Sequence, residues 1–357
     1  MRPGESPAIR HLGENRMVAR FRELASAGPG SGVLIGSGDD AAVVTVAEDR
    51  SLLLTCDMMV ENVHFRREWA RPEQIGWKAM VQNLSDIAAM GGAPAFAVAS
   101  LAAPGDLPPQ VAEGITQGLV AAAAEHGATL VGGDLVGSPG PIVIDVALTG
   151  WVEREVMLLR GGAQPGDAIC VTGSLGASAA GLAARQQGLA DDTMSELATA
   201  FKAHHEPRPR VLEGQAIAAT RRATAMMDVS DGLGEDLPRL CAASGVRARI
   251  YVDKIPVDPA CVAVAAKLGL DPISLATSGG EDYELLFTCP QDAVEEIAAA
   301  AARTGTAVTA IGETAPGEGA VLVDLCGKAR AFPQSFDHFA DPSPCPRGEE
   351  PQSPGDR

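Results

Sequence analysis

The chain has 357 residues and a formal net charge of −18 at pH 7. This length exceeds one typical domain and suffices for two domains with a sizeable core. The charge argues against a protein that coats nucleic acid or an anionic membrane, because those surfaces would repel it. It does not exclude a nucleotide site, where bound cations reverse the local field.

The seven cysteines are scattered and form no C-x-x-C pair. This spacing argues against a zinc site or a disulfide framework and favours a reducing compartment. The N-terminus has no apolar signal segment, and no stretch is apolar over the length of a membrane-spanning helix. We therefore expect a cytoplasmic protein with no membrane or nucleic-acid partner.

Hydrophobic periodicity predicts alternating helices and strands in the first half of the chain. Residues 1–12 are expected to form a flexible arm, and residues 13–153 an N-terminal domain. The predicted helices cover residues 14–27, 74–90 and 109–126. The predicted strands cover residues 41–46, 51–55, 96–101, 129–132 and 142–151.

Turn residues between positions 153 and 167 mark a domain boundary. Residues 154–340 are expected to form a C-terminal domain, and the Pro-rich, polar residues 341–357 a disordered tail. Here the predicted helices cover residues 178–187, 209–220, 231–244, 259–268 and 293–302. The predicted strands cover residues 168–172, 247–252, 283–288, 308–312 and 320–325, with a further strand ending at 228–231. This order predicts an α+β fold with mixed layers in two domains.

Acidic residues recur at predicted element ends, often beside a glycine or a hydroxyl group. The clusters are Gly38-Asp39-Asp40, Thr55-Cys56-Asp57, Asn83-Leu84-Ser85-Asp86, Gly132-Gly133-Asp134, Asp228-Val229-Ser230-Asp231-Gly232 and Ser278-Gly279-Gly280-Glu281-Asp282. Each cluster alone also fits an ordinary role as a turn, a helix cap or a solvent-facing acid. Together they offer at least five carboxylates, the hard oxygen ligands that Mg²⁺ shares with substrate phosphates.

Several other nucleotide and catalytic motifs are missing from the sequence. Gly36-x-Gly38 precedes a strand where a dinucleotide fingerprint requires a helix. The chain has neither a P-loop nor the protein-kinase signature set. The His and Cys residues do not pair into a nucleophile system, so metal-assisted chemistry remains the better interpretation.

In this order the motifs resemble those of the thiamine-monophosphate kinase family. This family belongs to the superfamily that includes aminoimidazole ribonucleotide synthetase and selenophosphate synthetase. Besides the acidic clusters, the resemblance rests on three segments: Asp57-x6-His64-Phe65, Val171-Thr172-Gly173 and Tyr283-Glu284-Leu285-Leu286-Phe287. It extends from about residue 14 to residue 339.

The resemblance implies two α/β domains, with the N-terminal domains binding ATP and metal and pairing across a homodimer into a barrel-like sheet. It implies transfer of the ATP γ-phosphate to thiamine monophosphate, assisted by Mg²⁺, with no catalytic base. The implied metal positions are Asp40, Thr55, Asp57, Asp86, Asp134, Asp228 and Asp231. The implied ATP contacts are Gly133, Asp134, Arg160 and Ser230. The implied contacts of the thiamine substrate are His64, Glu281 and Phe336.

The chain departs from the family pattern at three places. Cys56 stands where the family usually has Thr, and Leu135-Val136 follow the Gly-Gly-Asp motif where Thr-Thr is frequent. The C-terminal Trp-x-His-Phe motif reads Phe-Asp-His-Phe at residues 336–339. Two alternatives stay open from the sequence: a sister enzyme of the superfamily with another acceptor, and a non-catalytic protein that binds a nucleotide or metal.

Overall fold

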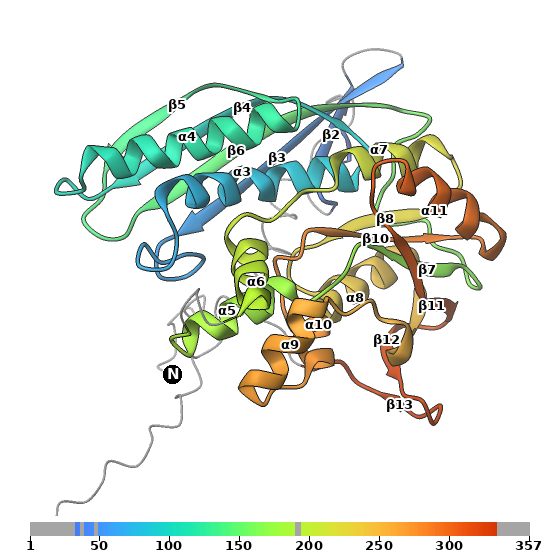
Figure 1. Cartoon of the computed structure of the whole chain (residues 1–357). Helices are drawn as coiled ribbons and strands as arrows, with labels where there is room; N and C mark the ends of the chain where they lie inside the picture. Colours follow the sequence, from blue (N-terminus) through green and yellow to red (C-terminus); the bar gives the residue numbers. More distant parts are fainter. Residues whose placement is uncertain (1–32, 36–38, 46–48, 190–193, 334–357) are drawn as a thin grey trace, which may run out of the picture. The chain divides into compact units, whose positions relative to one another are not determined.

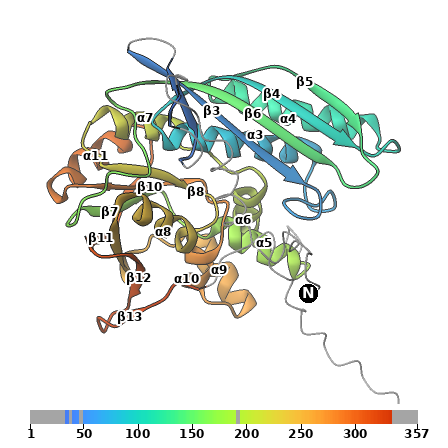
Figure 2. The same cartoon turned by 180° about the vertical axis from the view of Figure 1, so that it is seen from behind.

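The computed structural model describes residues 33–35, 39–45, 49–189 and 194–333. All of them lie within one compact unit, Ala27–Phe336. The predicted arm, the helix at 14–27, the C-terminal tail and Phe336 lie outside the described residues. Two sheets, each covered by helices, form the two halves of this unit, which confirms the predicted two-domain fold of mixed α and β layers (Figures 1 and 2).

The first sheet has six strands in the order β1-β2-β3-β6-β4-β5. Their bounds are β1 Val33–Ile35, β2 Ala42–Thr45, β3 Arg50–Val60, β4 Ala93–Ala103, β5 Thr129–Gly137 and β6 Val143–Glu153. Two helices, α3 (Pro72–Ala89) and α4 (Pro109–Glu125), lie side by side on one face (Figures 1 and 2). Among the described residues this sheet is open, with β1 and β5 at its edges, so a single chain forms no closed barrel.

Alternation of side chains gives the first sheet one buried face and one exposed face. On β3, Leu53 and Met59 are buried under the helices, whereas Leu54 and Met58 are exposed on the other side. The two helices can approach each other closely because Gly118 has no side chain. A Cβ at this position would lie 1.9 Å from the Glu73 carbonyl oxygen. The exposed face carries no helix among the described parts of the chain.

The second sheet has seven strands in the order β13-β12-β9-β11-β7-β10-β8. Their bounds are β7 Ala168–Thr172, β8 Ala225–Val229, β9 Val246–Tyr251, β10 Glu284–Cys289, β11 Val308–Pro316, β12 Gly319–Val323 and β13 Ala329–Arg330. The α-helices of this half are α5 Ala177–Gln186, α6 Ser195–His205, α7 Val211–Ala219, α8 Leu233–Ser244, α9 Pro259–Leu268, α10 Pro272–Ser278 and α11 Val294–Ala302. Two short 3₁₀ turns are η1 Val252–Lys254 and η2 Gln291–Ala293.

The central strands of the second sheet are buried on both faces. On β7, Ala168 and Cys170 belong to a core shared with α3, while Ile169 and Val171 belong to a core shared with α8. The same alternation on β8 turns Met226 toward the first core, and Asp228 two residues later follows that direction. This places a carboxylate of the second half opposite helix α3 of the first.

Most predicted elements are found, with differences at their ends. Strands β3 and β5 run to Val60 and Gly137, beyond their predicted ends. Helix α6 and the short helix α10 were not predicted, and α8 starts at Leu233 because Gly232 adopts φ +97°. None of the described helices is long and apolar enough to cross a membrane.

Candidate metal and phosphate site

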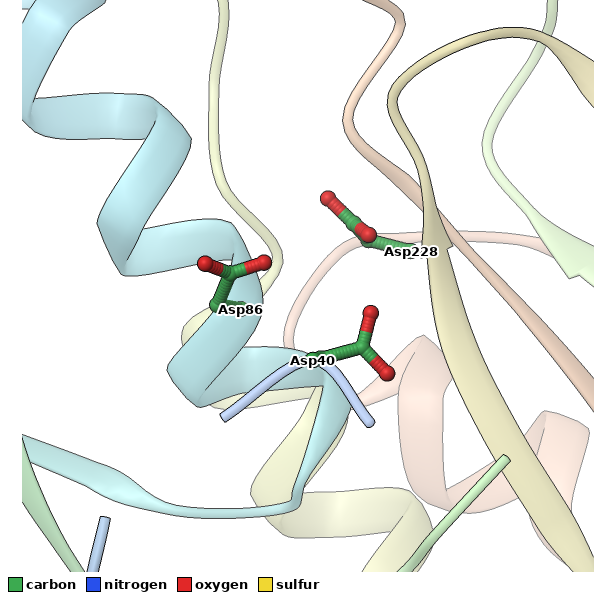
Figure 3. Close-up of side chains that lie close together, drawn as sticks. All are labelled: Asp40, Asp86 and Asp228. Atoms are coloured by element: carbon green, nitrogen blue, oxygen red, sulfur yellow. The ribbon is translucent and has the colours of Figure 1, made fainter. Parts of the chain in front are cut away.

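Three aspartates from distant parts of the sequence converge between the two sheets. They are Asp40 before β2, Asp86 on α3 and Asp228 on β8 (Figure 3). One carboxylate oxygen of each lies within 4.8 Å of the others. Asp40 and Asp228 are buried, and Asp86 is half-buried. The structure thus brings together three of the predicted metal positions.

Two hydroxyl groups orient these carboxylates. The Ser85 hydroxyl on α3 donates to Asp228 Oδ2 at 2.6 Å, which ties helix α3 to strand β8. Thr55 on β3 donates a hydrogen bond to Asp86 Oδ2. Asp57, two residues along the same strand, also lies against Asp86. The predicted positions Thr55 and Asp57 therefore adjoin the three-aspartate cluster.

Burial and mutual repulsion make this cluster electrostatically unfavourable as carboxylates alone. Burial, followed by the neighbouring Asp57 and Asp228, raises the pKa of Asp86 well above its usual value. Burial and then Asp40 have the same effect on the pKa of Asp228. Close carboxylates in a low-dielectric site require a cation or a proton to share their charge. The donor set, all hard oxygens, fits a divalent cation such as Mg²⁺.

Arg160 balances one side of the cluster. Its Nε donates to Asp40 Oδ2 at 3.0 Å and its Nη2 to Asp40 Oδ1 at 2.8 Å, a bidentate pair. The Arg160 backbone N–H donates to both carboxylate oxygens of Asp39. Burial, with repulsion from Asp40, raises the pKa of Asp39 to about 6. Arg160, which was predicted to contact ATP, is thus paired in this structure with Asp40, which was predicted to bind metal.

The loop after β8 is held by residues that the sequence analysis did not single out. Asp236, fully buried on α8, accepts hydrogen bonds at 3.0 Å from the backbone N–H groups of Ser230 and Asp231. Arg239 donates to Asp231 Oδ2 at 2.6 Å and to Asp236 Oδ1 at 2.9 Å. An acid three residues before an arginine within a predicted helix was the only sequence signal for this support.

Gly133 and Asp134 lie on the edge strand β5, away from the three-aspartate cluster. Gly133 stands in the same row across the sheet as Asp57, through Val146 and Ala99. Because side chains alternate along a strand, Asp134 points to the opposite face from Asp57. The role of Asp134 as a metal ligand stays a prediction.

The two described substrate residues lie near each other and share one lysine. Glu281, in the loop before β10, forms an ion pair with Lys78 of α3 at 2.5 Å. The Lys78 ammonium also donates to the backbone carbonyl oxygen of His64 at 3.4 Å. His64 Nδ1 accepts a hydrogen bond from the Val60 N–H at 3.0 Å. The third predicted substrate residue, Phe336, lies outside the described residues.

Family models place both halves of the chain in one group of proteins. The N-terminal domain of AIR synthase related proteins matches residues 38–152, and the C-terminal domain matches residues 164–324. A thiamine-monophosphate kinase of Mycobacterium tuberculosis is 39% identical over 287 residues, which cover 79% of this chain and 82% of the relative. The chain belongs to the thiamine-monophosphate kinase family. It is therefore a kinase, and the resemblance drawn from the motifs is confirmed.

Other members of the thiamine-monophosphate kinase family match over nearly their whole length. The enzyme of Salmonella typhimurium is 35% identical over 332 residues, which cover 92% of this chain and 99% of the relative. A solved structure described as AaThiL complexed with AMPPCP and TMP superposes with a TM-score of 0.82 at 33% identity. That match covers 94% of this chain and 99% of the other.

Proposed function

We propose that this kinase transfers the γ-phosphate of ATP to the phosphate of thiamine monophosphate, giving thiamine diphosphate and ADP with the assistance of Mg²⁺. The observation that carries the metal part of the proposal is the convergence of Asp40, Asp86 and Asp228, with carboxylate oxygens within 4.8 Å of one another. The names of the relatives and the AMPPCP and TMP bound to AaThiL support the two substrates.

The chemistry of the acceptor explains why the site holds carboxylates and no general base. A phosphate monoester is already an anion near neutral pH, so one of its oxygens can attack the γ-phosphorus without losing a proton to the protein. The bond between the γ-phosphorus and the β,γ-bridging oxygen breaks, and ADP leaves. When bound, Mg²⁺ supplies the positive charge that lets two phosphate anions approach each other.

The residues of the chain then have positioning and electrostatic roles. Asp40, Asp86 and Asp228 would hold the cations, with Asp57 and Asp231 beside them. Thr55 and Ser85 keep two of these carboxylates in fixed orientations. Arg160, which is paired with Asp40 here, would turn part of its guanidinium toward the nucleotide phosphates.

The nucleotide would enter beside β5. A cavity of about 790 Å³ lies between β4, β5 and α4, and its walls include Gly133 and Asp134. Ile115, Leu119 and Leu130 provide apolar surface for a base and ribose. Gly133 permits close approach of strands here, since a Cβ would lie 1.9 Å from the Ala99 carbonyl oxygen. Ser230 would contact the phosphates from the opposite side.

The thiamine substrate would be held near Glu281 and His64, with Phe336 as a further predicted contact. Glu281 also lines a cavity of about 320 Å³ together with Ser178, Lys202 and Arg210. A partly exposed carboxylate of this kind can accept a hydrogen bond from an aminopyrimidine ring. This arrangement would place the acceptor in the second half of the molecule, facing the cations.

We also propose a homodimer in which the exposed face of the first sheet is covered by a second copy. That face carries large apolar side chains that a monomer would leave in water: Leu54, Met58, Phe96, Val98 and Val136. Exposed apolar patches of this extent mark interaction surfaces. Two such sheets facing each other would give the barrel-like arrangement of the family.

The test is an assay of the purified protein with ATP, Mg²⁺ and thiamine monophosphate. Thiamine diphosphate and ADP should form in equal amounts, and neither should form when Mg²⁺ is replaced by EDTA. Unphosphorylated thiamine serves as the matched control, because it lacks the phosphate group that accepts the transferred phosphoryl group. ATP binding without turnover would instead indicate a nucleotide sensor, and ADP formation independent of the thiamine compound would indicate another acceptor.

A further inference from the structure

Lys78 is a charged residue in the interior of the protein. It lies in the middle of helix α3, and its side chain is only 2% exposed. A buried ammonium is costly unless an anion and hydrogen-bond acceptors surround it. The Lys78 ammonium contacts Glu281 Oε1 at 2.5 Å and the backbone carbonyl oxygen of His64 at 3.4 Å. Both belong to residues that the family pattern assigns to the thiamine substrate.

The loop that carries Glu281 has a constrained backbone. Glu281 adopts φ +68°, a left-handed conformation that non-glycine residues rarely adopt. Its N–H donates to the Ser230 carbonyl oxygen at 2.7 Å. The neighbouring Gly280 leaves no room for a side chain, since a Cβ there would lie 2.4 Å from the same oxygen. This conformation directs the Glu281 side chain toward α3 and α6.

A second group holds the other carboxylate oxygen. His204 Nδ1 of α6 lies 3.2 Å from Glu281 Oε2 and 3.2 Å from the Ser178 hydroxyl. Burial, with the charge of Lys78, lowers the pKa of His204 and so favours the neutral ring, whose Nδ1–H can donate to the carboxylate. Lys78 is therefore the charged partner of Glu281. Although burial opposes ionisation, Lys78 and then His204 lower the pKa of Glu281 to about 2.

The contacts leave the Glu281 carboxylate able to bind a substrate. Each carboxylate oxygen can accept more than one hydrogen bond, and the side chain remains 23% exposed. The same ammonium fixes the position of the turn that carries His64. One lysine of the first half thus connects two predicted substrate residues that lie in different halves of the chain.

We propose that Lys78 is a positioning residue for the thiamine substrate: it holds the Glu281 carboxylate and the His64 backbone in the geometry that binds the acceptor. This inference rests on the proposed function, because the acceptor is the ligand whose binding it explains. Lys78 is 2% exposed, so it acts through Glu281 and His64. It should have little influence on the nucleotide.

The test compares the wild type with K78M, K78R, E281Q and the double variant K78M/E281Q in steady-state kinetics for both substrates. K78M should raise KM for thiamine monophosphate ~10- to 100-fold, the loss expected for a hydrogen bond to a charged group, with KM for ATP changed by less than about threefold. K78R, which keeps the charge, should restore much of this loss. The exposed Lys267 on α9 provides the matched control, and K267M should behave as the wild type.

Thermal unfolding separates positioning from stability. K78M and E281Q each leave one buried charge without its partner, so both should lower Tm, whereas K78M/E281Q removes both charges and should recover part of it. KM for thiamine monophosphate should nevertheless stay high in the double variant. Should K78M not fold, K78Q, whose amide can still donate to Glu281, is measured in its place.

The outcomes distinguish this inference from the proposed function. Wild-type protein without turnover of thiamine monophosphate would overturn the proposed function, and the role of Lys78 with it. Wild-type turnover together with an unchanged KM for thiamine monophosphate in K78M would overturn the role of Lys78 alone. Equal increases of KM for both substrates, in parallel with the loss of Tm, would show a purely structural lysine and also overturn it.

Discussion

The guanidinium group of Arg160 forms a bidentate ion pair with the carboxylate of Asp40, with N–O distances of 3.0 and 2.8 Å. Asp40 also belongs to the cluster that we propose to bind Mg²⁺. Arg160 supplies positive charge that the buried carboxylate requires, and under the proposed function a bound cation would share the same carboxylate.

This pairing predicts the behaviour of R160A. Without the guanidinium, the metal-free protein should lose about 3 kcal/mol of unfolding free energy, because a buried carboxylate loses its partner. Mg²⁺ should then raise Tm by more in R160A than in the wild type, because the Asp40 carboxylate of R160A has no arginine partner and its charge is left for the cation to neutralise. Differential scanning fluorimetry with EDTA and with Mg²⁺ measures both effects. An equal Mg²⁺-induced increase in the two proteins would contradict the pairing.

The ion pair of Glu281 predicts a pH dependence of stability. The pKa of Glu281 is lowered to about 2 in the folded protein from 4.5 in the unfolded chain. The unfolded state therefore binds the extra proton between these values, and the stability present above pH 4.5 is lost as the pH falls toward 2. The difference in unfolding free energy between the wild type and E281Q should shrink by about 1 kcal/mol from pH 5 to pH 3.5. Urea unfolding at the two pH values measures it, and a constant difference would refute the assignment.

Substitutions of the adjacent residues Thr55 and Cys56 should have different effects on activity. Thr55 faces the cluster and donates to Asp86, whereas Cys56 is exposed on the other face of β3. T55V should lower kcat/KM ~10-fold or more, because Asp86 loses the hydrogen bond that orients it, while T55S keeps the hydroxyl and most of the activity. C56T, which restores the usual family residue, should stay within about threefold of the wild type. A large gain in C56T would show that position 56 contributes to the site.

The exposed face of the first sheet predicts the oligomeric state. Val98 lies on that face and is 47% exposed in the single chain. V98E should convert a dimer into a monomer, because two glutamates would have to be buried in the interface. Light scattering after size-exclusion chromatography measures the mass, with L325E as the control, since Leu325 is 83% exposed near β13. A wild-type monomer, or a V98E dimer, would contradict the proposed interface.

The sequence predicted most strands and helices because their periodicity is local. It missed α6 because residues 195–205 mix His, Lys and Thr with few large apolar residues, so no clear hydrophobic stripe identifies the helix. It placed the end of β5 too early because Gly132-Gly133 looks like a turn, whereas pairing with β4 keeps both glycines extended. In such segments tertiary contacts override local propensity.

In the candidate site, too, some residues could be predicted from the sequence and others could not. Asp40, Asp86 and Asp228 were selected through the family resemblance, and the position of Asp86 among apolar residues of a helix already indicated that it needs a partner. Lys78 could not be predicted, since one lysine on a helix normally reaches solvent and only its 2% exposure reveals the buried pair with Glu281. Contacts between residues 120 or more positions apart, such as Arg160 with Asp40, follow from the packing of the two halves and leave no local pattern.

The rate of thiamine diphosphate formation by the wild type and D228N, measured in parallel at saturating ATP and Mg²⁺, tests the central claim most directly. Asn keeps the size of Asp228 and can still accept the hydrogen bond from Ser85, so D228N should fold and show a Tm at or above that of the wild type. It should nevertheless be at least ~1,000-fold slower, because it lacks a charge that holds the cation against the transferred phosphate. A folded D228N that forms thiamine diphosphate within about threefold of the wild-type rate would contradict the account.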